Sequence, residues 1–104
     1  MLVQFKNAYL QKLFEGKPVA GKPKYSSEIT NKFKKTILKL QYADSVLEIT
    51  KLKGLHFEAL KGDWKGHYSV RVDYQYRLIL TVDNNEMISI TDVLIMHDLT
   101  NHYQ

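Results

Sequence analysis

The chain has 104 residues, 44% of them hydrophobic, which suits one domain over residues 1–104 with a single core and excludes a disordered tail. It contains no cysteine, which excludes a disulfide scaffold, a thiolate zinc site and a cysteine nucleophile, and indicates a reducing cytoplasm. Fifteen Lys and Arg against eleven Asp and Glu leave a formal charge of +4, which favours polyanionic partners such as nucleic acid.

The first predicted helix covers residues 6–15. Its apolar side chains recur at helical spacing, and they are Tyr9, Leu10, Leu13 and Phe14. Gly16 and Pro18 follow, where they stop a helix. Residues 19–24 then read as a loop, because they include Gly21 and Pro23.

A second helix is predicted to start at Ser26 or Ser27, since a serine hydroxyl accepts a hydrogen bond from the first turn of a helix. Its buried stripe is formed by Ile29, Phe33, Ile37 and Leu40. Lysines cover the remaining faces, at positions 32, 34, 35 and 39. We interpret this run of charge as a solvated helix surface, in preference to an RNA-binding face.

A short third helix is predicted to begin after Ser45 and to end near Gly54. Ser45 and Glu48 have the spacing of a capping box, in which each side chain accepts a hydrogen bond from a backbone N–H at the start of the helix. The chain up to this point is therefore predicted to be mainly helical.

From Phe57 onward the apolar residues recur with a period of two, which is typical of strands. The alternation covers residues 68–73 and 77–82, and a turn at 83–86 predicts a hairpin onto a strand at 87–92, with Ile88 and Ile90 on one side. Helices followed by hairpin-linked strands indicate an α+β fold, in which the N-terminal helices pack on one face of an antiparallel sheet. The other face is then free to bind a ligand.

Two features argue against export and membrane insertion. The N-terminus lacks the charged start, long apolar run and cleavage site of a secretory signal. The longest apolar run, residues 93–96, is too short to span a bilayer. We therefore expect a soluble cytoplasmic protein without a membrane partner.

Residues 60–72 read LKGDWKGHYSVRV, and residues 75–77 read QYR. This order of a Leu-Lys-Gly-Asp loop, a Tyr-Ser-hydrophobic-Arg strand and a Gln-aromatic-Arg turn resembles the central signature of the HigB toxins of type II toxin-antitoxin systems. Residues 3–6, VQFK, and 12–16, KLFEG, are similar to the first strand and helix of that family.

The resemblance implies a RelE-like fold and a toxin that cuts messenger RNA on the ribosome, and so inhibits translation and growth. It also implies neutralisation by a HigA-like helix-turn-helix antitoxin. Operator DNA would be contacted only through that antitoxin.

RNA cleavage by attack of a ribose 2′-OH on the adjacent phosphate needs a proton acceptor, cations around the phosphate and an acid for the leaving 5′-oxygen, without a metal or cofactor. Exposed guanidinium groups suit phosphate oxygens, and Arg71 and Arg77 are predicted on adjacent strands, with Lys61 and Lys65 flanking them from a loop. The resemblance favours Arg77, Arg71 and Lys61 as catalytic residues. In the alternative interpretation, the arginines are surface residues paired with a nearby carboxylate, Asp73 or Glu58.

The resemblance is weaker toward the C-terminal end. HigB toxins close soon after their last strand with an Asp-Tyr-His triplet, whose ring stacks on a base and whose histidine helps proton transfer. At the corresponding place, residues 92–94 of this chain read DVL. Either His97 or the pair His102 and Tyr103, in what reads as a C-terminal extension, supplies these groups, or the extension is a frayed end. We expect His97 to be the catalytic imidazole, because it lies nearer the strand.

Five residues are candidates for binding RNA. Lys65 and Trp64 lie in the predicted loop, Tyr74 lies in the turn between the arginine strands, and His102 and Tyr103 follow in the extension. Trp64 either stacks on RNA or closes the hydrophobic core. The four histidines do not have a metal-ligand spacing, so no metal is predicted.

Two other functions compete with RNA cleavage. The same fold can block DNA gyrase without cutting anything, as ParE-like toxins do, and a toxin that has lost its activity can remain a module that binds only its antitoxin. The basic residues Lys61, Arg71 and Arg77 favour the nuclease, whereas the altered C-terminal end favours a changed activity.

Overall fold

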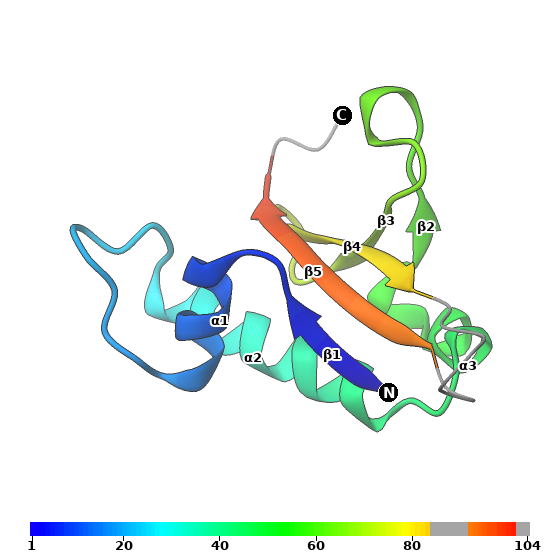
Figure 1. The fold of residues 1–104 in the computed structure, drawn as a ribbon, viewed down its shortest axis with the longest axis horizontal. Helices are drawn as coiled ribbons and strands as arrows, with labels where there is room; N and C mark the ends of the chain where they lie inside the picture. Colours follow the sequence, from blue (N-terminus) through cyan, green and yellow to red (C-terminus); the bar gives the residue numbers. More distant parts are fainter. Residues whose placement is uncertain (84–91, 102–104) are drawn as a thin grey trace.

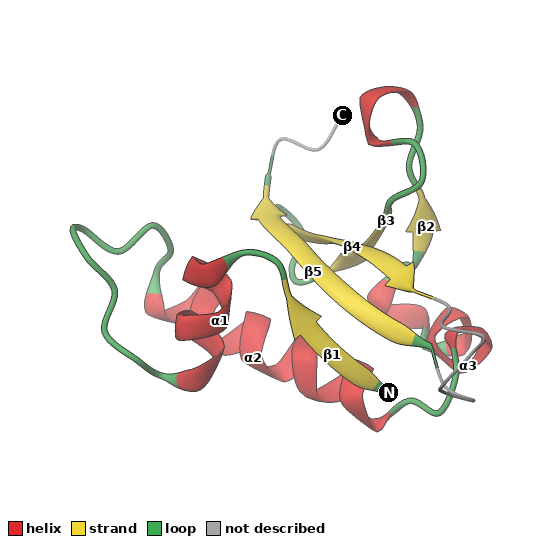
Figure 2. Cartoon of the chain, viewed as in Figure 1, coloured by secondary structure: helices red, strands yellow, loops and turns green. Residues whose placement is uncertain are grey.

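The computed structural model describes residues 1–83 and 92–101. The helices are α1 (Ala8–Glu15), α2 (Ser27–Tyr42) and α3 (Val46–Lys51), with short 3₁₀ turns η1 (Lys53–Leu55) and η2 (Gly62–Trp64). The strands are β1 (Leu2–Phe5), β2 (Glu58–Ala59), β3 (Tyr68–Arg71), β4 (Arg77–Asp83) and β5 (Val93–Thr100). The helices precede all strands except β1 (Figure 2), so the predicted α+β class is confirmed.

All five strands belong to one sheet, in the order β1-β5-β4-β3-β2. The pairs among β2, β3, β4 and β5 are antiparallel, as predicted, but β1 runs parallel to β5, with Leu2 opposite Val93 and Phe5 opposite Met96. The prediction of a wholly antiparallel sheet is therefore wrong at this edge. A parallel pair needs a long crossover, and the chain between β1 and β5 supplies it, with α1 and α2 lying along one side of the sheet (Figure 1).

Helix α1 begins at Ala8, two residues later than predicted. The Oδ1 atom of Asn7 accepts hydrogen bonds from the backbone N–H groups of Tyr9 and Leu10, at 3.0 and 3.2 Å, and so caps the helix. Residue 6 lies before the helix, because the backbone of Asn7 is extended, and its own N–H continues the pairing of β1 by donating to the carbonyl of Met96. Gly16 ends the helix in the left-handed region, with a φ of 73°, as its position predicted.

The caps predicted for the next two helices are present. Ser26 Oγ accepts from the N–H of Ile29 at 3.2 Å and begins α2. Ser45 Oγ accepts from the N–H of Glu48 at 3.1 Å, while the carboxylate of Glu48 accepts from the N–H of Asp44, one residue before the position of the ideal capping box. Helix α3 ends at Lys51, and η1 covers the rest of the segment up to Leu55.

The core lies between α1, α2 and α3 and one face of the sheet. Its helical part includes the whole predicted stripe of α2, and its strand part consists of Val70, Leu78, Leu80, Leu94, Met96 and Leu99. Alternation along the strands directs Ser69, Arg71, Arg77 and Thr81 to the opposite side, which we call the outer face. In β4, the central strand of the sheet, Arg77, Leu78, Ile79 and Leu80 are all buried.

Residues 93–100 form the last strand, β5, so the prediction that they are an extension is wrong. The strand is difficult to recognise because it contains a β-bulge: Asp98 lies opposite Ile79 and Met96 opposite Leu80, which leaves His97 as an extra residue. Buried residues therefore fall at 94, 96 and 99 instead of every second position. The strand predicted at residues 87–92 lies outside the described residues, apart from Asp92.

Beyond Met96, β5 extends past the end of β1, and side chains cover its open edge. Asn7 Nδ2 donates to the carbonyl of His97 at 3.2 Å, and the hydroxyl of Tyr25 donates to the carbonyl of Leu99 at 2.7 Å. Burial, followed by the nearby Asp98 carboxylate, raises the pKa of Tyr25 to about 12. In the part of the chain that the structure describes, no helix is long and apolar enough to cross a membrane.

Candidate active site on the outer face of the sheet

Arg71 and Arg77 lie directly opposite each other across β3 and β4, so the prediction that they occupy adjacent strands is confirmed. Both belong to the outer face. Their surroundings differ, because Arg71 is partly exposed whereas Arg77 has only 8% of its surface exposed. The expectation that Arg77 is an exposed strand arginine is therefore wrong.

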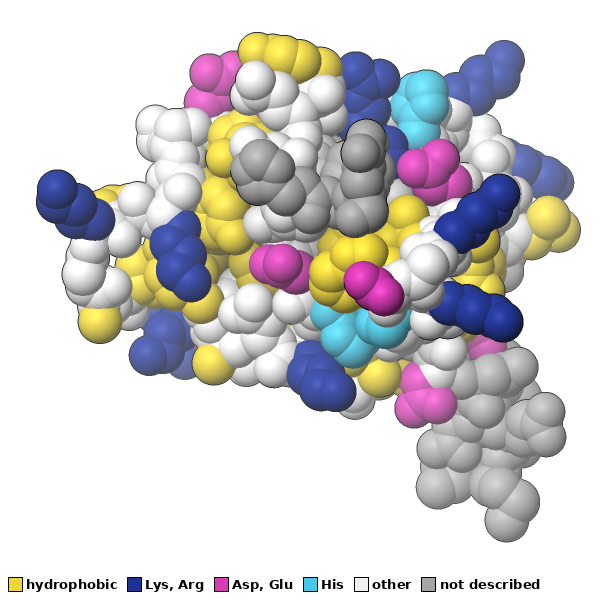
Figure 3. Space-filling view, turned by 90° about the horizontal axis from the view of Figure 1, so that it is seen from above, with side chains coloured by type: hydrophobic (Ala, Val, Ile, Leu, Met, Phe, Trp, Pro, Cys, Tyr) yellow, Lys and Arg dark blue, Asp and Glu magenta, His cyan; other side chains and the backbone are white. Residues whose placement is uncertain are grey.

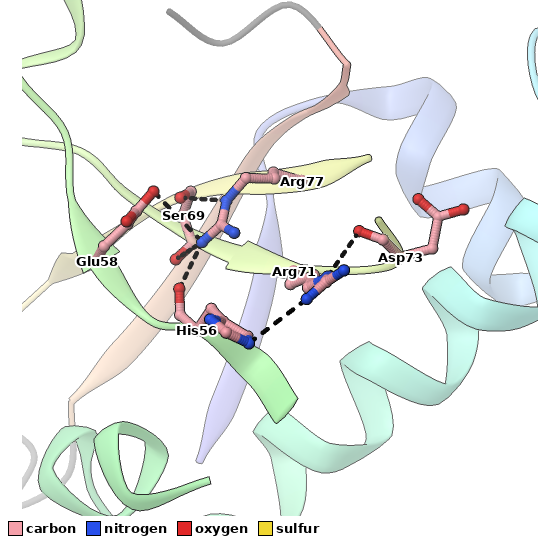
Figure 4. A network of polar contacts seen from close by, with 6 residues as sticks. All are labelled: His56, Glu58, Ser69, Arg71, Asp73 and Arg77. Carbon is pink, nitrogen blue, oxygen red and sulfur yellow. Dashed lines mark hydrogen bonds and ion pairs between the residues drawn. The ribbon is translucent and has the colours of Figure 1, made fainter. Parts of the chain in front are cut away.

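Among the described residues, Ser69, His56 and Glu58 hold Arg77 (Figure 4). Its Nε donates to Ser69 Oγ at 2.8 Å, its Nη2 donates to the carbonyl of His56, and Nη2 also lies 3.6 Å from the Oε1 atom of Glu58. The Glu58 side chain is about half exposed (53%) and is brought in by β2, where Glu58 pairs with Ser69. A buried guanidinium of this kind is a fixed cation with an exposed carboxylate beside it.

Arg71 is anchored more loosely. Its Nε donates to the backbone carbonyl of Asp73 at 3.2 Å, and its Nη1 lies 3.5 Å from the His56 ring (Figure 4). The Asp73 carboxylate does not pair with Arg71, because it accepts from the backbone N–H groups of Gln75 and Tyr76 and so shapes the turn between β3 and β4. The alternative of arginine-carboxylate pairing thus holds for Arg77 and Glu58, and not for Arg71 and Asp73.

His56 and Glu58 are site residues that sequence reasoning missed. His56 follows η1 in a left-handed conformation, with a φ of 44°, which directs its carbonyl to Arg77 while its ring lies near Arg71. The sequence suggests Glu58 only as the partner of a surface ion pair. Strand β2 has only two residues and therefore no detectable periodicity. The one feature of the sequence that points to His56 and Glu58 is that both lie close to the Leu-Lys-Gly-Asp segment.

The structure does not bring Lys61 and Lys65 beside the two arginines. Both lysines are exposed and belong to the loop between β2 and β3, which joins β3 at Tyr68, whereas Arg71 is at the other end of that strand. Trp64, at the end of η2, is partly buried and lies outside the main core cluster. Its ring meets the ring of His67 edge to face, with 5.2 Å between centroids.

His97 also lies away from Arg77. Its Nε2 is 2.8 Å from Thr81 Oγ1, and its ring meets the His67 ring at 4.9 Å. Thr81 is four residues from Arg77 along β4, about 13 Å at the usual rise of a strand. Burial, the neighbouring His67 and the charge of Lys6 lower the pKa of His97 below its ordinary value.

Three predicted site residues remain, which are Tyr74, His102 and Tyr103. Tyr74 is 78% exposed in the turn between the two arginine strands. Thr100, the last residue of β5, lies opposite Arg77, so the position after the last strand is residue 101 and not residues 92–94. His102 and Tyr103, the other candidates for the groups of the terminal triplet, lie outside the described residues. Among residues 1–83 and 92–101, no group of three His, Asp or Glu side chains is arranged to hold a metal ion.

Comparisons with known proteins agree with this fold. The YoeB/ParE toxin from Agrobacterium tumefaciens is 17% identical, with a TM-score of 0.58 over 99% of this chain and 100% of that one. The YoeB-YefM complex from Staphylococcus aureus is 22% identical, with a TM-score of 0.54 over 99% of each chain. YafQ from E. coli is 13% identical, with a TM-score of 0.51 over 94% of this chain and 89% of that one.

At these identities the structural similarity shows the fold alone, and it confirms the RelE-like architecture. A search of curated proteins finds no match. Residues 3–93 match the HigB-like toxin family, described as the RelE-like toxin of the type II toxin-antitoxin system HigB. Since this match covers most of the chain, the protein belongs to the HigB-like family of RelE-like toxins, whose partners are antitoxins.

Proposed function

We propose that this toxin is an endoribonuclease that cuts messenger RNA on the ribosome and thereby inhibits translation and growth. The observation that carries the proposal is the pairing of buried Arg77 with the exposed carboxylate of Glu58, 3.6 Å apart on the sheet face that the helices leave open. The arrangement combines a fixed cation for a phosphate with a carboxylate that can accept a proton.

In the proposed reaction the ribose 2′-oxygen attacks the adjacent phosphorus while Glu58 takes the 2′-hydroxyl proton. The bond between phosphorus and the 5′-oxygen breaks, which leaves a 2′,3′-cyclic phosphate and a 5′-hydroxyl. Arg77 stabilises the charge that develops on the phosphate, and Arg71, opposite it, is the second cation. His56 is a positioning residue, since its carbonyl holds Arg77.

The acid for the leaving oxygen is proposed to be His102. Since β5 ends at Thr100, opposite Arg77, His102 follows the strand by two residues and Tyr103 by three. An imidazole titrates near neutral pH and can donate the proton, while the Tyr103 ring can stack on a base, together with exposed Tyr74. In this proposal His102 has the catalytic role that the sequence predicts for His97.

Ribosome dependence is proposed because only a small part of Arg77 is exposed to an RNA strand. Ser69, His56 and Glu58 hold its guanidinium, so a flexible RNA strand must be positioned accurately against it. The antitoxin is proposed to be a HigA-like helix-turn-helix protein that binds operator DNA. The net charge of +4 favours both the ribosome and an acidic antitoxin surface.

The test is cleavage of a defined message by purified toxin, with and without ribosomes that are translating it, followed by primer extension and analysis of the new ends. We expect cuts only with ribosomes, cyclic phosphate and 5′-hydroxyl ends, and loss of cutting in Glu58→Gln. Lys35→Ala is the matched control, because Lys35 is exposed on α2, away from the outer face. If the toxin arrests growth while messages stay intact and DNA supercoiling is inhibited, the nuclease proposal is wrong and the toxin inhibits gyrase.

A further inference from the structure

A second cluster of side chains lies at the other end of β4 from Arg77. The rings of Trp64, His67 and His97 form a continuous series, with centroids 5.2 Å apart for the first pair and 4.9 Å for the second. Thr81, on the outer face of β4, holds the last ring through a 2.8 Å hydrogen bond to His97 Nε2. We call these three rings the ring platform.

The chain places these rings together by three separate devices. The bulge in β5 adds His97 as an extra residue, which reorients its side chain toward Thr81. Gly62 and Gly66, with φ of 64° and 89°, allow the turns that fold the loop around Trp64. The backbone of His67 is fixed at the base of the loop, since its carbonyl accepts from the N–H of Leu60 at 2.9 Å.

The platform is not explained by core packing. All three side chains stay partly exposed, and Trp64 belongs neither to the main core cluster nor to the hydrophobic residues packed against it. Among the described residues, the Nδ1 atom of His67 is buried without a hydrogen-bond partner, which is a cost that a purely structural aromatic residue would not incur. The proposed reaction does not use these rings.

Three lysines lie near the platform. Lys61 and Lys65 are exposed on the same loop as Trp64. The charge of Lys6 lowers the pKa of His97. The neighbouring acidic groups are Asp63 in the loop and Asp98 beside His97. Figure 3 shows histidine side chains at the surface, with both basic and acidic side chains near them. Aromatic rings within a basic surface are the usual features of a site for single-stranded nucleic acid.

The distance from the platform to Arg77 suits one RNA strand that contacts both. Thr81 and Arg77 are separated by about 13 Å along β4, a span that a few nucleotides of single-stranded RNA can cover. The strand would cross the outer face, with its reacting phosphate at Arg77 and a neighbouring base at the rings.

We propose that Trp64, His67 and His97 form a second RNA subsite, in which a base a few nucleotides from the cut bond stacks on the ring platform. The inference rests on the proposed function, because it takes messenger RNA as the ligand. In this proposal Lys61 and Lys65 contact the phosphate backbone of the same RNA segment. It also assigns His97 to binding and not to proton transfer.

Binding is tested with the full-length toxin and a 2′-O-methylated RNA hexamer, which cannot be cut because its 2′-oxygens are blocked. Trp64 is the single tryptophan, so its fluorescence reports directly on the platform. We expect saturable quenching by the hexamer and none by an abasic backbone of the same length and charge. Equal quenching by the abasic backbone would overturn base stacking.

Affinities of variants are measured by the anisotropy of a fluorescein-labelled hexamer. His97→Ala and Trp64→Ala are each expected to weaken binding about tenfold, with His97→Phe restoring most of the loss, because a stacked ring and not a charge is required. Lys35→Ala is the matched control and keeps full affinity. Circular dichroism checks the fold of each variant, and Trp64→Ala, in an exposed loop, keeps the proposal testable if His97→Ala unfolds.

Unchanged affinity in folded Trp64→Ala and His97→Ala would overturn the subsite. The result is independent of the proposed activity, which is measured by ribosome-dependent cutting. A toxin that binds the hexamer through the platform but never cuts a translated message would retain the subsite and lose the nuclease. A toxin that cuts normally but binds abasic and normal hexamers equally would lose the subsite alone.

Discussion

Arg77 and Glu58 form an ion pair at 3.6 Å in which the arginine is almost completely buried and the carboxylate about half exposed. The pair joins the central strand β4 to the two-residue edge strand β2, across Ser69 of β3. This asymmetry separates two roles, since the cation is part of the folded structure whereas the carboxylate remains accessible to a substrate. Each half of the pair therefore has a different expected response to mutation.

Replacing Arg77 by alanine is expected to damage the fold as well as the activity, contrary to the expectation for an exposed strand arginine. The change leaves Ser69 Oγ and the His56 carbonyl without the donors that now satisfy them, at a cost of about 2–4 kcal/mol of unfolding free energy. Urea denaturation measures this cost. Arg77→Lys keeps the charge and should lose less stability, and Arg71→Ala, at a partly exposed site, should lose least. Wild-type stability in Arg77→Ala would show that these contacts contribute nothing to folding.

Glu58→Gln is expected to lower the rate of message cleavage by about 10²–10⁴-fold, because an amide cannot accept the 2′-hydroxyl proton. Glutamine keeps the size of the side chain beside Arg77, and the lost ion pair involves a half-exposed carboxylate, so stability and ribosome affinity should stay close to those of the parent. Single-turnover cleavage on programmed ribosomes measures the chemical step, and sedimentation with ribosomes measures binding. A variant that cuts at the parent rate rules out Glu58 as the base.

Lys61→Ala and Lys65→Ala are expected to weaken association with ribosomes or RNA without slowing the chemical step, because both lysines are exposed in a loop at the far end of β3 from Arg71. Each loss should be several-fold at low ionic strength and should shrink as salt rises, since screening removes the contribution of exposed charges. The measurement is KM and kcat for ribosome-dependent cutting over a salt series. A fall in kcat alone, with KM constant, would place Lys61 in the catalytic machinery after all.

The stability of the toxin is expected to depend on pH through His97. Its pKa is lowered in the folded protein, first by burial and then by His67 and Lys6, from the ordinary value of 6.5. Below pH 6.5 the unfolded chain gains a proton that the folded chain resists, so stability falls as the pH drops from 6.5 toward the lower folded pKa, and rises again with pH. Urea denaturation at a series of pH values measures how the unfolding free energy changes with pH. This change should be smaller in His97→Gln. An identical slope in the variant assigns the effect to another group.

Shortening the chain is expected to separate the fold from the catalytic groups. Ending it after Asp98 removes Leu99, which is 2% exposed in the core, and Thr100, which pairs with Arg77, so this protein should be strongly destabilised. Ending it after Asn101 keeps the whole of β5 and removes His102 and Tyr103. Thermal denaturation should then show a folded protein, and ribosome assays should show little cutting. Full cutting by the longer truncation would exclude His102 as the acid.

Several features of this protein follow from the sequence alone because they depend on residues three or four positions apart. The caps at Ser26 and Ser45, the stop at Gly16 and the buried stripe of α2 are local patterns, and each is present in the structure. The family signature in residues 60–77 is also local, and the family match confirms it. The α+β class follows from the same periodicities.

Only the tertiary structure decided how the outer face is organised. β2 has two residues, and the bulge at His97 interrupts the two-residue period of β5, so neither strand has a clear sequence pattern. The parallel pairing of β1 with β5 joins residues about 90 positions apart, and Arg77 contacts His56 across 21 positions. Such contacts form because the sheet brings distant strands side by side, and no short stretch of sequence specifies them. The burial of Arg77 and the closeness of His67 to His97 depend on this same assembly.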